Sequence, residues 1–167
     1  MSLETEIKVK NLIKGAIYRV RYRAVNSIGS GEWSDLAYIR VAQVPEPPPT
    51  PVLTAVENTI VSLQLSISTN DGGTGIIAYH LFLNEGVNGS PFNEITDYDG
   101  SALTYDIAVD DVVGGHTVAT GNFYAIKYIA ENAVGMSLDS DLLYVALARQ
   151  SETPAAPVFD ETRSTRM

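Results

Sequence analysis

The chain has 167 residues, 45% of them hydrophobic and 19% charged, a balance typical of a folded globular protein rather than a disordered one. Its 11 basic and 20 acidic residues give a net charge of −9, which disfavours nucleic acid and membrane surfaces as partners. Cysteine is absent, which excludes disulfides, thiolate chemistry and cysteine zinc sites, and no apolar run approaches the ~20 residues that insert across a membrane.

The predicted elements are all strands, since no segment keeps a 3.6-residue period. Residues 59–68 alternate with period two and end at the turn cluster "TNDGGTG" (69–75), and Asn88-Gly89 is a strong hairpin signal. The segment "DIAVDDVVGG" (106–115) is disfavoured as a helix by its β-branched residues and its Gly pair. Strands are predicted at 59–68, 76–84, 92–95, 103–109, 123–131 and 142–148.

An internal repeat relates two ends of the chain. Residues 15–42 align without a gap on residues 121–148, a period of 106, which suits one small β domain per repeat. Eleven of the 28 aligned positions are identical: Gly15/Gly121, Tyr18/Tyr124, Tyr22/Tyr128, Ala24/Ala130, Asn26/Asn132, Gly29/Gly135, Ser34/Ser140, Asp35/Asp141, Leu36/Leu142, Tyr38/Tyr144 and Ala42/Ala148.

The repeat predicts the domain organisation. Proline-rich boundaries stand at "VPEPPPTP" (44–51) and "ETPAAP" (152–157), and such segments make stiff spacers. We expect residues 1–43 to supply the last three strands of one repeat. Residues 44–148 are expected to form a complete domain, and residues 149–167 a linker and the first strand of a following repeat.

Both copies resemble the fibronectin type III family. The resemblance rests on the proline-rich opening before "PVLTAV" (51–56) and on "GIIAYHLFL" (75–83). It rests equally on "GAIYRVRYRAVNSIGSGEWS" (15–34) and its copy "GNFYAIKYIAENAVGMSLDS" (121–140). It implies an all-β fold, a seven-stranded antiparallel, immunoglobulin-like β-sandwich.

The resemblance also implies local details. Tyr18 and Tyr124 are expected to form tyrosine corners, in which the hydroxyl bonds backbone near the strand-crossing loop. The chain departs from the family pattern at Ile67, where the family has Trp, and at 110–117, where the loop looks expanded.

Candidate interaction residues follow from alternation along the strands. Tyr124, Ile126, Tyr128 and Ala130 are expected to point inward, so Ile129 points outward. In the family order the third, sixth and seventh strands are neighbours, which predicts one exposed apolar patch of Phe82, Ile129 and Tyr144. The family also binds partners through loops, which adds Asn132, Gly135 and Met136; the simpler interpretation of Gly135 is a turn that needs positive φ.

No catalytic residue is predicted. His80 lies on an outer strand face and His116 in a loop, and neither has a nucleophile partner at a recognisable spacing. The "NDGGTG" run (70–75) lacks the Lys and helix of a phosphate loop, and "DYDG" (97–100) lacks the further ligands of a calcium loop. The sequence thus predicts no enzyme, no cofactor and no metal.

The predicted role is a non-catalytic structural, adhesion or protein-interaction module of a multi-repeat protein, at the cell surface or outside the cell. The alternatives are an accessory region of a secreted or surface enzyme with its catalytic domain elsewhere, and an intracellular scaffold. A protein partner is expected. Residues 1–43 would expose apolar side chains and a strand edge, which predicts self-association through this segment; folding back onto the complete domain is the competing possibility.

Overall fold

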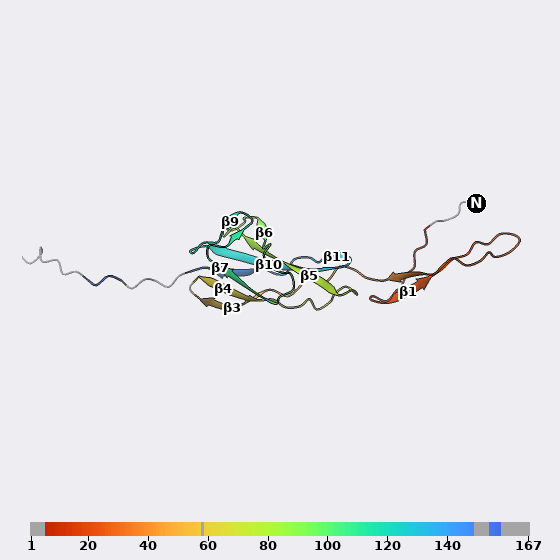
Figure 1. Cartoon of the computed structure of the whole chain (residues 1–167), viewed down its shortest axis with the longest axis horizontal. Coiled ribbons are helices and arrows are strands. Elements are labelled where there is room, and N and C mark those ends of the chain that lie inside the picture. Colours follow the sequence, from red (N-terminus) through yellow and green to blue (C-terminus); the bar gives the residue numbers. More distant parts are fainter. Residues whose placement is uncertain (1–5, 58, 149–153, 158–167) are drawn as a thin grey trace, which may run out of the picture.

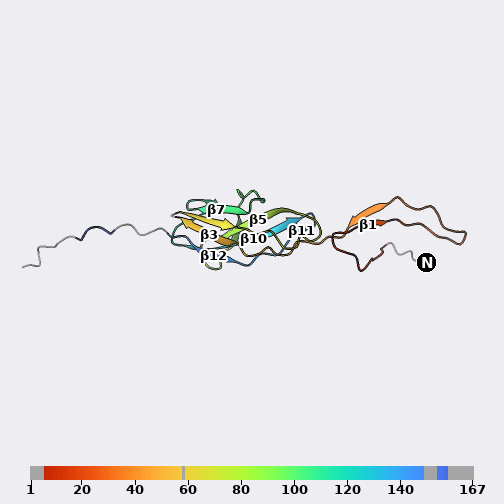
Figure 2. The same ribbon diagram turned by 90° about the horizontal axis from the view of Figure 1, so that it is seen from below.

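The computed structural model describes residues 6–57, 59–148 and 154–157. Its larger part is a sandwich of two antiparallel sheets (Figures 1 and 2). One sheet has the order β3-β4-β7, and the other runs β11-β10-β5-β6, with β12 also paired to β10. The strands are β3 (Val52–Glu57), β4 (Ile60–Gln64), β5 (Ile76–Asn84), β6 (Phe92–Glu94), β7 (Thr104–Ala108), β10 (Phe123–Asn132), β11 (Gly135–Met136) and β12 (Leu143–Ala146). This confirms the predicted all-β sandwich.

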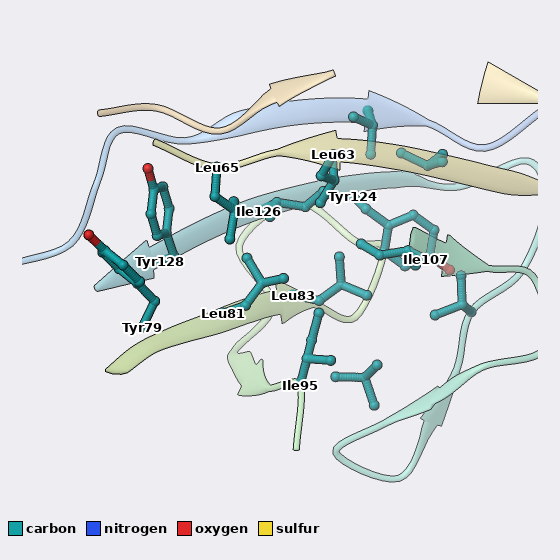
Figure 3. Packing of buried hydrophobic residues seen from close by; sticks show 14 of the residues in the cluster. Leu63, Leu65, Tyr79, Leu81, Leu83, Ile95, Ile107, Tyr124, Ile126 and Tyr128 are labelled. Atoms are coloured by element: carbon teal, nitrogen blue, oxygen red, sulfur yellow. The ribbon is translucent and has the colours of Figure 1, made fainter. Parts of the chain in front are cut away.

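The core lies between the two sheets. Alternate residues of β4, β5 and β10 belong to the core cluster, as period-two patterning requires. On β10 the opposite face is also covered in part, since Ala125 and Ile129 are buried as well. Tyr79 and Tyr128 close one end of the core, with ring centroids 5.8 Å apart (Figure 3). Ile67 is exposed and does not take the place of a core residue, whereas Leu65 on the same stretch is buried. All buried members of the core cluster come from residues 61–147.

One hairpin was not predicted. β8 (Val112–Val113) and β9 (His116–Thr117) pair across Gly114 and Gly115, whose φ values are +60° and +85°. Two central residues with positive φ match the right-handed twist of a two-residue hairpin. The extra residues at 110–117 therefore form a small β-ribbon rather than an irregular loop.

The first copy of the repeat forms a separate two-stranded sheet. β1 (Ile17–Val20) pairs antiparallel with β2 (Ala37–Arg40), beyond one end of the sandwich (Figure 1). Three strands were expected here, and the described residues form two of them. The counterpart of β7, one period earlier, would fall at or before residue 2, which lies outside the described residues. The strand expected to open a third repeat begins at residue 158 and lies outside the described residues.

Within the described part of the chain, no helix is long and apolar enough to cross a membrane.

Candidate functional site

The outer face of the five-stranded sheet carries the residues predicted to form an apolar patch. Tyr144 is 66% exposed and Phe82 is half-buried, but Ile129 is only 8% exposed. Ile129 points away from the core, as predicted, yet it is flanked on both sides. His80 of β5 lies opposite it in the strand register. On its other side, the Ser140 hydroxyl accepts the Tyr128 N–H at 3.1 Å and so holds the chain beside β10.

A charged cluster interrupts the face at this point. Nδ1 of His80 lies 2.6 Å from Oε1 of Glu94 on β6, and its Nε2 lies 2.9 Å from Oε2 of Glu131 on β10. Both contacts are hydrogen bonds only when the imidazole is doubly protonated. Partial burial alone lowers the pKa of His80, but the hydrogen bonds and charges of Glu131 and Glu94 outweigh it, so the pKa is raised above its ordinary value of 6.5.

A second polar contact covers the apolar rings. Nζ of Lys127 lies 2.7 Å from Oδ2 of Asp139, 4.5 Å from the centroid of the Phe92 ring and 5.8 Å from that of Phe82. A cation over an aromatic face is a favourable contact that also screens the ring from a partner. The predicted continuous patch of Phe82, Ile129 and Tyr144 is therefore wrong as a description of the exposed surface, because Ile129 is covered and Phe82 is overlaid.

What remains exposed is a hollow beside Tyr144. It has a volume of about 620 Å³, and its apolar lining includes Phe92, Phe123, Leu142 and Tyr144. Asn84 and the hairpin turn at Asn88–Gly89 supply polar groups at its margin. The hollow combines exposed aromatic rings with a few polar groups, which is the composition of many protein-binding surfaces.

The predicted loop residues serve mainly to build a turn. Oδ1 of Asn132 accepts the N–H groups of Val134 at 2.8 Å and Gly135 at 3.1 Å. Gly135 has a φ of +150°, which side chains rarely adopt, so the predicted need for glycine is confirmed. Asn132 is buried, whereas Met136 is exposed. Of these three residues, Met136 is thus the one whose side chain is open to a partner.

Asn132 has a second role, which the sequence did not reveal. Its Nδ2 donates to the carbonyl of Gln43 at 2.8 Å and to that of Asp71 at 2.7 Å. The N–H of Gln43 in turn donates to the Gly72 carbonyl at 2.9 Å. One amide side chain therefore ties the linker, the 69–75 turn and the β10–β11 turn together.

The 69–75 turn also packs against the first copy of the repeat. A Cβ on Gly73 would lie 2.7 Å from the Gly15 nitrogen, and one on Gly72 would clash with the Gln43 carbonyl oxygen. Nζ of Lys14 donates to Oδ1 of Asn70 at 2.7 Å. The "NDGGTG" run is therefore a contact turn in which two glycines allow close approach of two backbones.

The remaining polar groups singled out in the sequence have structural partners. His116 pairs with Glu85 at 2.8 Å, and the Tyr105 hydroxyl donates to Asp97 at 2.7 Å. Burial raises the pKa of Tyr98, next to Tyr105, to about 12, with a smaller contribution from the charge of Asp99. Asp99 accepts the N–H groups of Ser101 and Ala102, both at 2.8 Å, which holds the "DYDG" turn.

Comparison with known proteins gives one relative by sequence. No family model matches the chain. A Kelch domain-containing protein from Sulfurisphaera tokodaii is 28% identical over 153 residues, which cover 89% of this chain. The chain spans 18% of the length of that relative.

Solved structures agree on the fold. The sixth fibronectin type III domain of human fibronectin type III domain containing protein 3 is 20% identical, with a TM-score of 0.53, and covers 69% of this chain and 96% of that one. A further fibronectin type III domain of that human protein is 28% identical, with a TM-score of 0.50 and the same coverages, 69% and 96%. The twitchin kinase region of C. elegans is 20% identical, with a TM-score of 0.54, over 68% of this chain and 18% of that one. Strands β3 to β12 thus form a fibronectin type III-like β-sandwich domain.

Proposed function

We propose that the chain is a non-catalytic structural and protein-interaction module of a multi-repeat protein. In this proposal residues 1–43 are the end of one repeat, residues 44–148 a complete repeat and residues 149–167 the start of a third. The supporting observation is the repeat itself: two segments 106 positions apart build the same strand pairing, with Tyr18 opposite Ile39 and Tyr124 opposite Val145. A fixed period of this kind is the signature of an array.

A turnover assay tests the non-catalytic part of the proposal. The chain is incubated with a broad panel of hydrolase substrates, alongside variants of its histidines, His80→Ala and His116→Ala. We expect no turnover above background in any of the three proteins. Reproducible turnover that is lost in one variant would contradict the proposal.

The hollow beside Tyr144 is the surface that we propose for a protein partner. Of the aromatic rings in its lining, Phe123 and Tyr144 are exposed, and Tyr side chains provide large, rigid contact area at low entropic cost. The chain carries a net charge of −9, which favours a partner whose rim around an apolar contact is basic. An adhesion or spacer role would use such contacts repeatedly along an array.

A matched pair of variants tests this surface. Tyr144→Glu places a charge in the hollow, and Val112→Glu places one on β8, outside the lining of the hollow, where the side chain is equally exposed at 67%. Proteins captured by the full chain are compared between the variants by quantitative mass spectrometry, followed by binding assays with each purified candidate. We expect Tyr144→Glu to lose a captured partner that Val112→Glu retains, with melting temperatures unchanged; equal binding by both variants would contradict the proposal.

Self-association through the β1–β2 sheet is a further part of the proposal. Several large apolar side chains of this segment are exposed, among them Tyr22, Val25, Ile28 and Tyr38. The hairpin contacts the sandwich at its base, through Lys14, Gly15 and Gln43, so its exposed apolar face is not covered by folding back. A second copy in a two-fold dimer would cover the unpaired strand edge by edge pairing, or this apolar face by sheet-on-sheet contact.

Light scattering as a function of concentration tests the dimer. The full chain is compared with a chain of residues 44–167, which keeps every buried member of the core cluster and so retains its own fold. We expect the full chain to dimerise at high concentration and the shorter chain to stay monomeric. A full chain that is strictly monomeric at high concentration would contradict the dimer.

A second candidate role is an accessory region of a larger protein with other domains. The chain spans 18% of a relative named as a Kelch domain-containing protein, and the twitchin structure combines the matching fold with a kinase. Sequencing the parent reading frame distinguishes the two roles: many further units of about this length favour an array, and one catalytic or Kelch domain favours the accessory role. An intracellular scaffold is compatible with either result.

A cell-surface or extracellular location belongs to the same proposal. Protease treatment of intact cells would remove a surface array and spare an intracellular scaffold.

A further inference from the structure

The end of the sandwich opposite the β1–β2 sheet repeats a surface that is already occupied elsewhere in the chain. At the base of the first copy, Gly15 has a φ of +81° and its N–H donates to the Val41 carbonyl at 2.7 Å. The Gly73 Cα lies 3.7 Å from where a Gly15 Cβ would be. The base of the first copy is therefore covered by the 69–75 turn of the sandwich that follows it.

The second copy builds the same base, and the described part of the chain places nothing over its glycine. Gly121 has a φ of +88°, and its N–H donates to the Leu147 carbonyl at 2.6 Å. The tyrosine corner beside it is also the same, since the Tyr124 hydroxyl accepts the Ala119 N–H at 2.8 Å and the Tyr18 hydroxyl accepts that of Ile13 at 2.9 Å. Among the described residues, no atom lies within 4 Å of a Cβ built on Gly121.

The prolines after each copy show the same contrast. Pro48 and Pro51 follow the first copy and are buried against the sandwich. Their counterparts one period later, Pro154 and Pro157, are exposed. Glu152 also stands in the sequence where Glu46 stands, and the Glu46 carboxylate accepts Nδ2 of Asn70 at 2.9 Å.

We propose that the end of the sandwich around Thr120, Gly121 and Leu147 is a docking surface for a further copy of the same β-sandwich unit. The occupant would place the equivalent of the 69–75 turn over Gly121 and would bury Pro154 and Pro157. Its turn must carry a Gly-Gly pair, because a Cβ at either glycine of the existing junction meets backbone at under 3 Å. The docking rests on the proposed multi-repeat role and gives it a geometry: successive units would form a stiff rod.

One contact of the existing junction has no counterpart. Lys14 donates to Asn70, but the equivalent residue is Thr120, whose side chain is too short to reproduce that bond. The docked arrangement would therefore depend on backbone contacts and on the Asn132 side chain of the incoming unit, which bonds the linker carbonyl at 2.8 Å in the existing junction.

An extended chain tests the proposal. Residues 1–157 are followed directly by a second copy of residues 52–148, so that the natural linker leads into the appended unit. Only the appended unit is labelled with 15N, by segmental ligation, and its rotational correlation time is measured by relaxation. We expect the appended unit to tumble with the correlation time of the whole chain.

Three variants in the appended copy make the result specific. Gly73→Val puts a side chain into the contact. Gly89→Val is the matched control: Gly89 has a φ of +80°, so the backbone cost is the same, but the added side chain would point into open space. Asn132→Asp keeps the oxygen that holds its own turn but loses the donor to the linker. We expect Gly73→Val and Asn132→Asp to shorten the correlation time towards that of a free unit and Gly89→Val to leave it unchanged.

The outcomes distinguish the docking proposal from the proposed non-catalytic role of the chain. A dispersed amide spectrum with independent tumbling of the unmodified appended unit would overturn the docking and leave the non-catalytic role standing. Equal tumbling in the Asn132→Asp and Gly89→Val variants would also overturn it, even where Gly73→Val fails to fold. Turnover in the substrate screen would instead contradict the proposed non-catalytic role, and it would leave the measured correlation times, and so the docking proposal, unaffected.

Discussion

The two copies of the repeat, residues 15–42 and 121–148, have the same local structure in different surroundings. The Ser34 hydroxyl accepts the Tyr22 N–H at 3.1 Å, and the Ser140 hydroxyl accepts the Tyr128 N–H at the same distance. The strand register is also the same one period apart, since Ile17 pairs with Arg40 and Phe123 pairs with Ala146. Short-range hydrogen bonds are therefore encoded within about 28 residues.

Burial is not encoded in the same way. Tyr22 is 74% exposed, and its counterpart Tyr128 is 0% exposed. The difference arises because β10 packs beside β5 and faces β4, whereas β1 pairs only with β2. The comparison teaches that identical residues contribute to stability in proportion to what the rest of the chain places over them.

Replacing the central tyrosine of each copy should give the largest contrast. Tyr128→Ala removes a buried ring and two hydrogen bonds to Ser66, at 2.9 and 3.1 Å, so we expect a loss of about 3 to 5 kcal/mol in the free energy of unfolding. Tyr22→Ala should change it by less than about 0.5 kcal/mol. Urea denaturation measures both, at a concentration where light scattering shows monomers. A comparable loss in both variants would mean that the first copy is covered in solution.

The tyrosine corners give the next contrast. Tyr124→Phe leaves the Ala119 N–H without the hydroxyl that it reaches at 2.8 Å, and we expect a loss of about 1 to 3 kcal/mol. Tyr18→Phe removes the same bond, to Ile13 at 2.9 Å, where water can replace it. Its effect on the unfolding of the sandwich should be close to zero. Equal destabilisation by the two variants, measured by thermal melting, would contradict this expectation.

The two serines that bond back to their strands should differ less. Ser140→Ala deletes the acceptor of the buried Tyr128 N–H and should cost about 1 kcal/mol. Ser34→Ala should lower the free energy of unfolding by only a few tenths of a kcal/mol, since the Tyr22 N–H lies near solvent. Hydrogen exchange at the two tyrosine amides is the direct measurement. Faster exchange at Tyr22 than at Tyr128 in the paired variants would agree, and the reverse order would argue against the burial difference.

The smallest expected effect is a pH dependence that only the sandwich can show. His80 lies in the sandwich, and its partner Glu131 belongs to the second copy of the repeat. The first copy has Val25 at the position of Glu131, so it cannot form this histidine–carboxylate contact. The pKa of His80 is raised in the folded state. Its stabilising contribution is therefore fully present below the unfolded-state pKa and is lost as pH rises through the folded-state pKa. We expect less than about 1 kcal/mol, because solvent screens the pair.

Melting temperatures across this pH range measure the effect. His80→Gln should flatten the profile, and His116→Gln is the matched control because it removes the other histidine. A profile that His80→Gln leaves unchanged would rule out the cluster as its source.

The sequence predicted the strands well because alternation records which side chains face the core. Leu81 and Leu83 on β5 and Ile126 on β10 are all buried, as their spacing requires. The β8–β9 hairpin was missed although its signal was present, since a Gly-Gly pair between Val113 and His116 favours a two-residue turn. Local patterns were therefore sufficient for the longer strands of the core, although β3, β8, β9 and β11 were not among the predicted strands.

The candidate surface was less predictable because alternation assigns a face without saying what covers it. Ile129 does point outward, but its cover comes from His80 and from the chain beside Ser140, which are 49 and 11 positions away. The Asn132 bonds to Gln43 and Asp71 span 89 and 61 positions and join three segments of the chain. Contacts of this kind depend on how the loops meet, which no short pattern in the chain records.

The positions of the two ends have a mechanical consequence. The chain enters the sandwich at one end, through the buried prolines and β3, and the segment 154–157 lies beyond the other end (Figures 1 and 2). Tension applied along the chain would pull parallel to β3, whose hydrogen bonds to β4 lie across the strand. These bonds would be loaded together in shear rather than opened one after another. Resistance to force would then depend on the rate of unfolding and not on its equilibrium free energy.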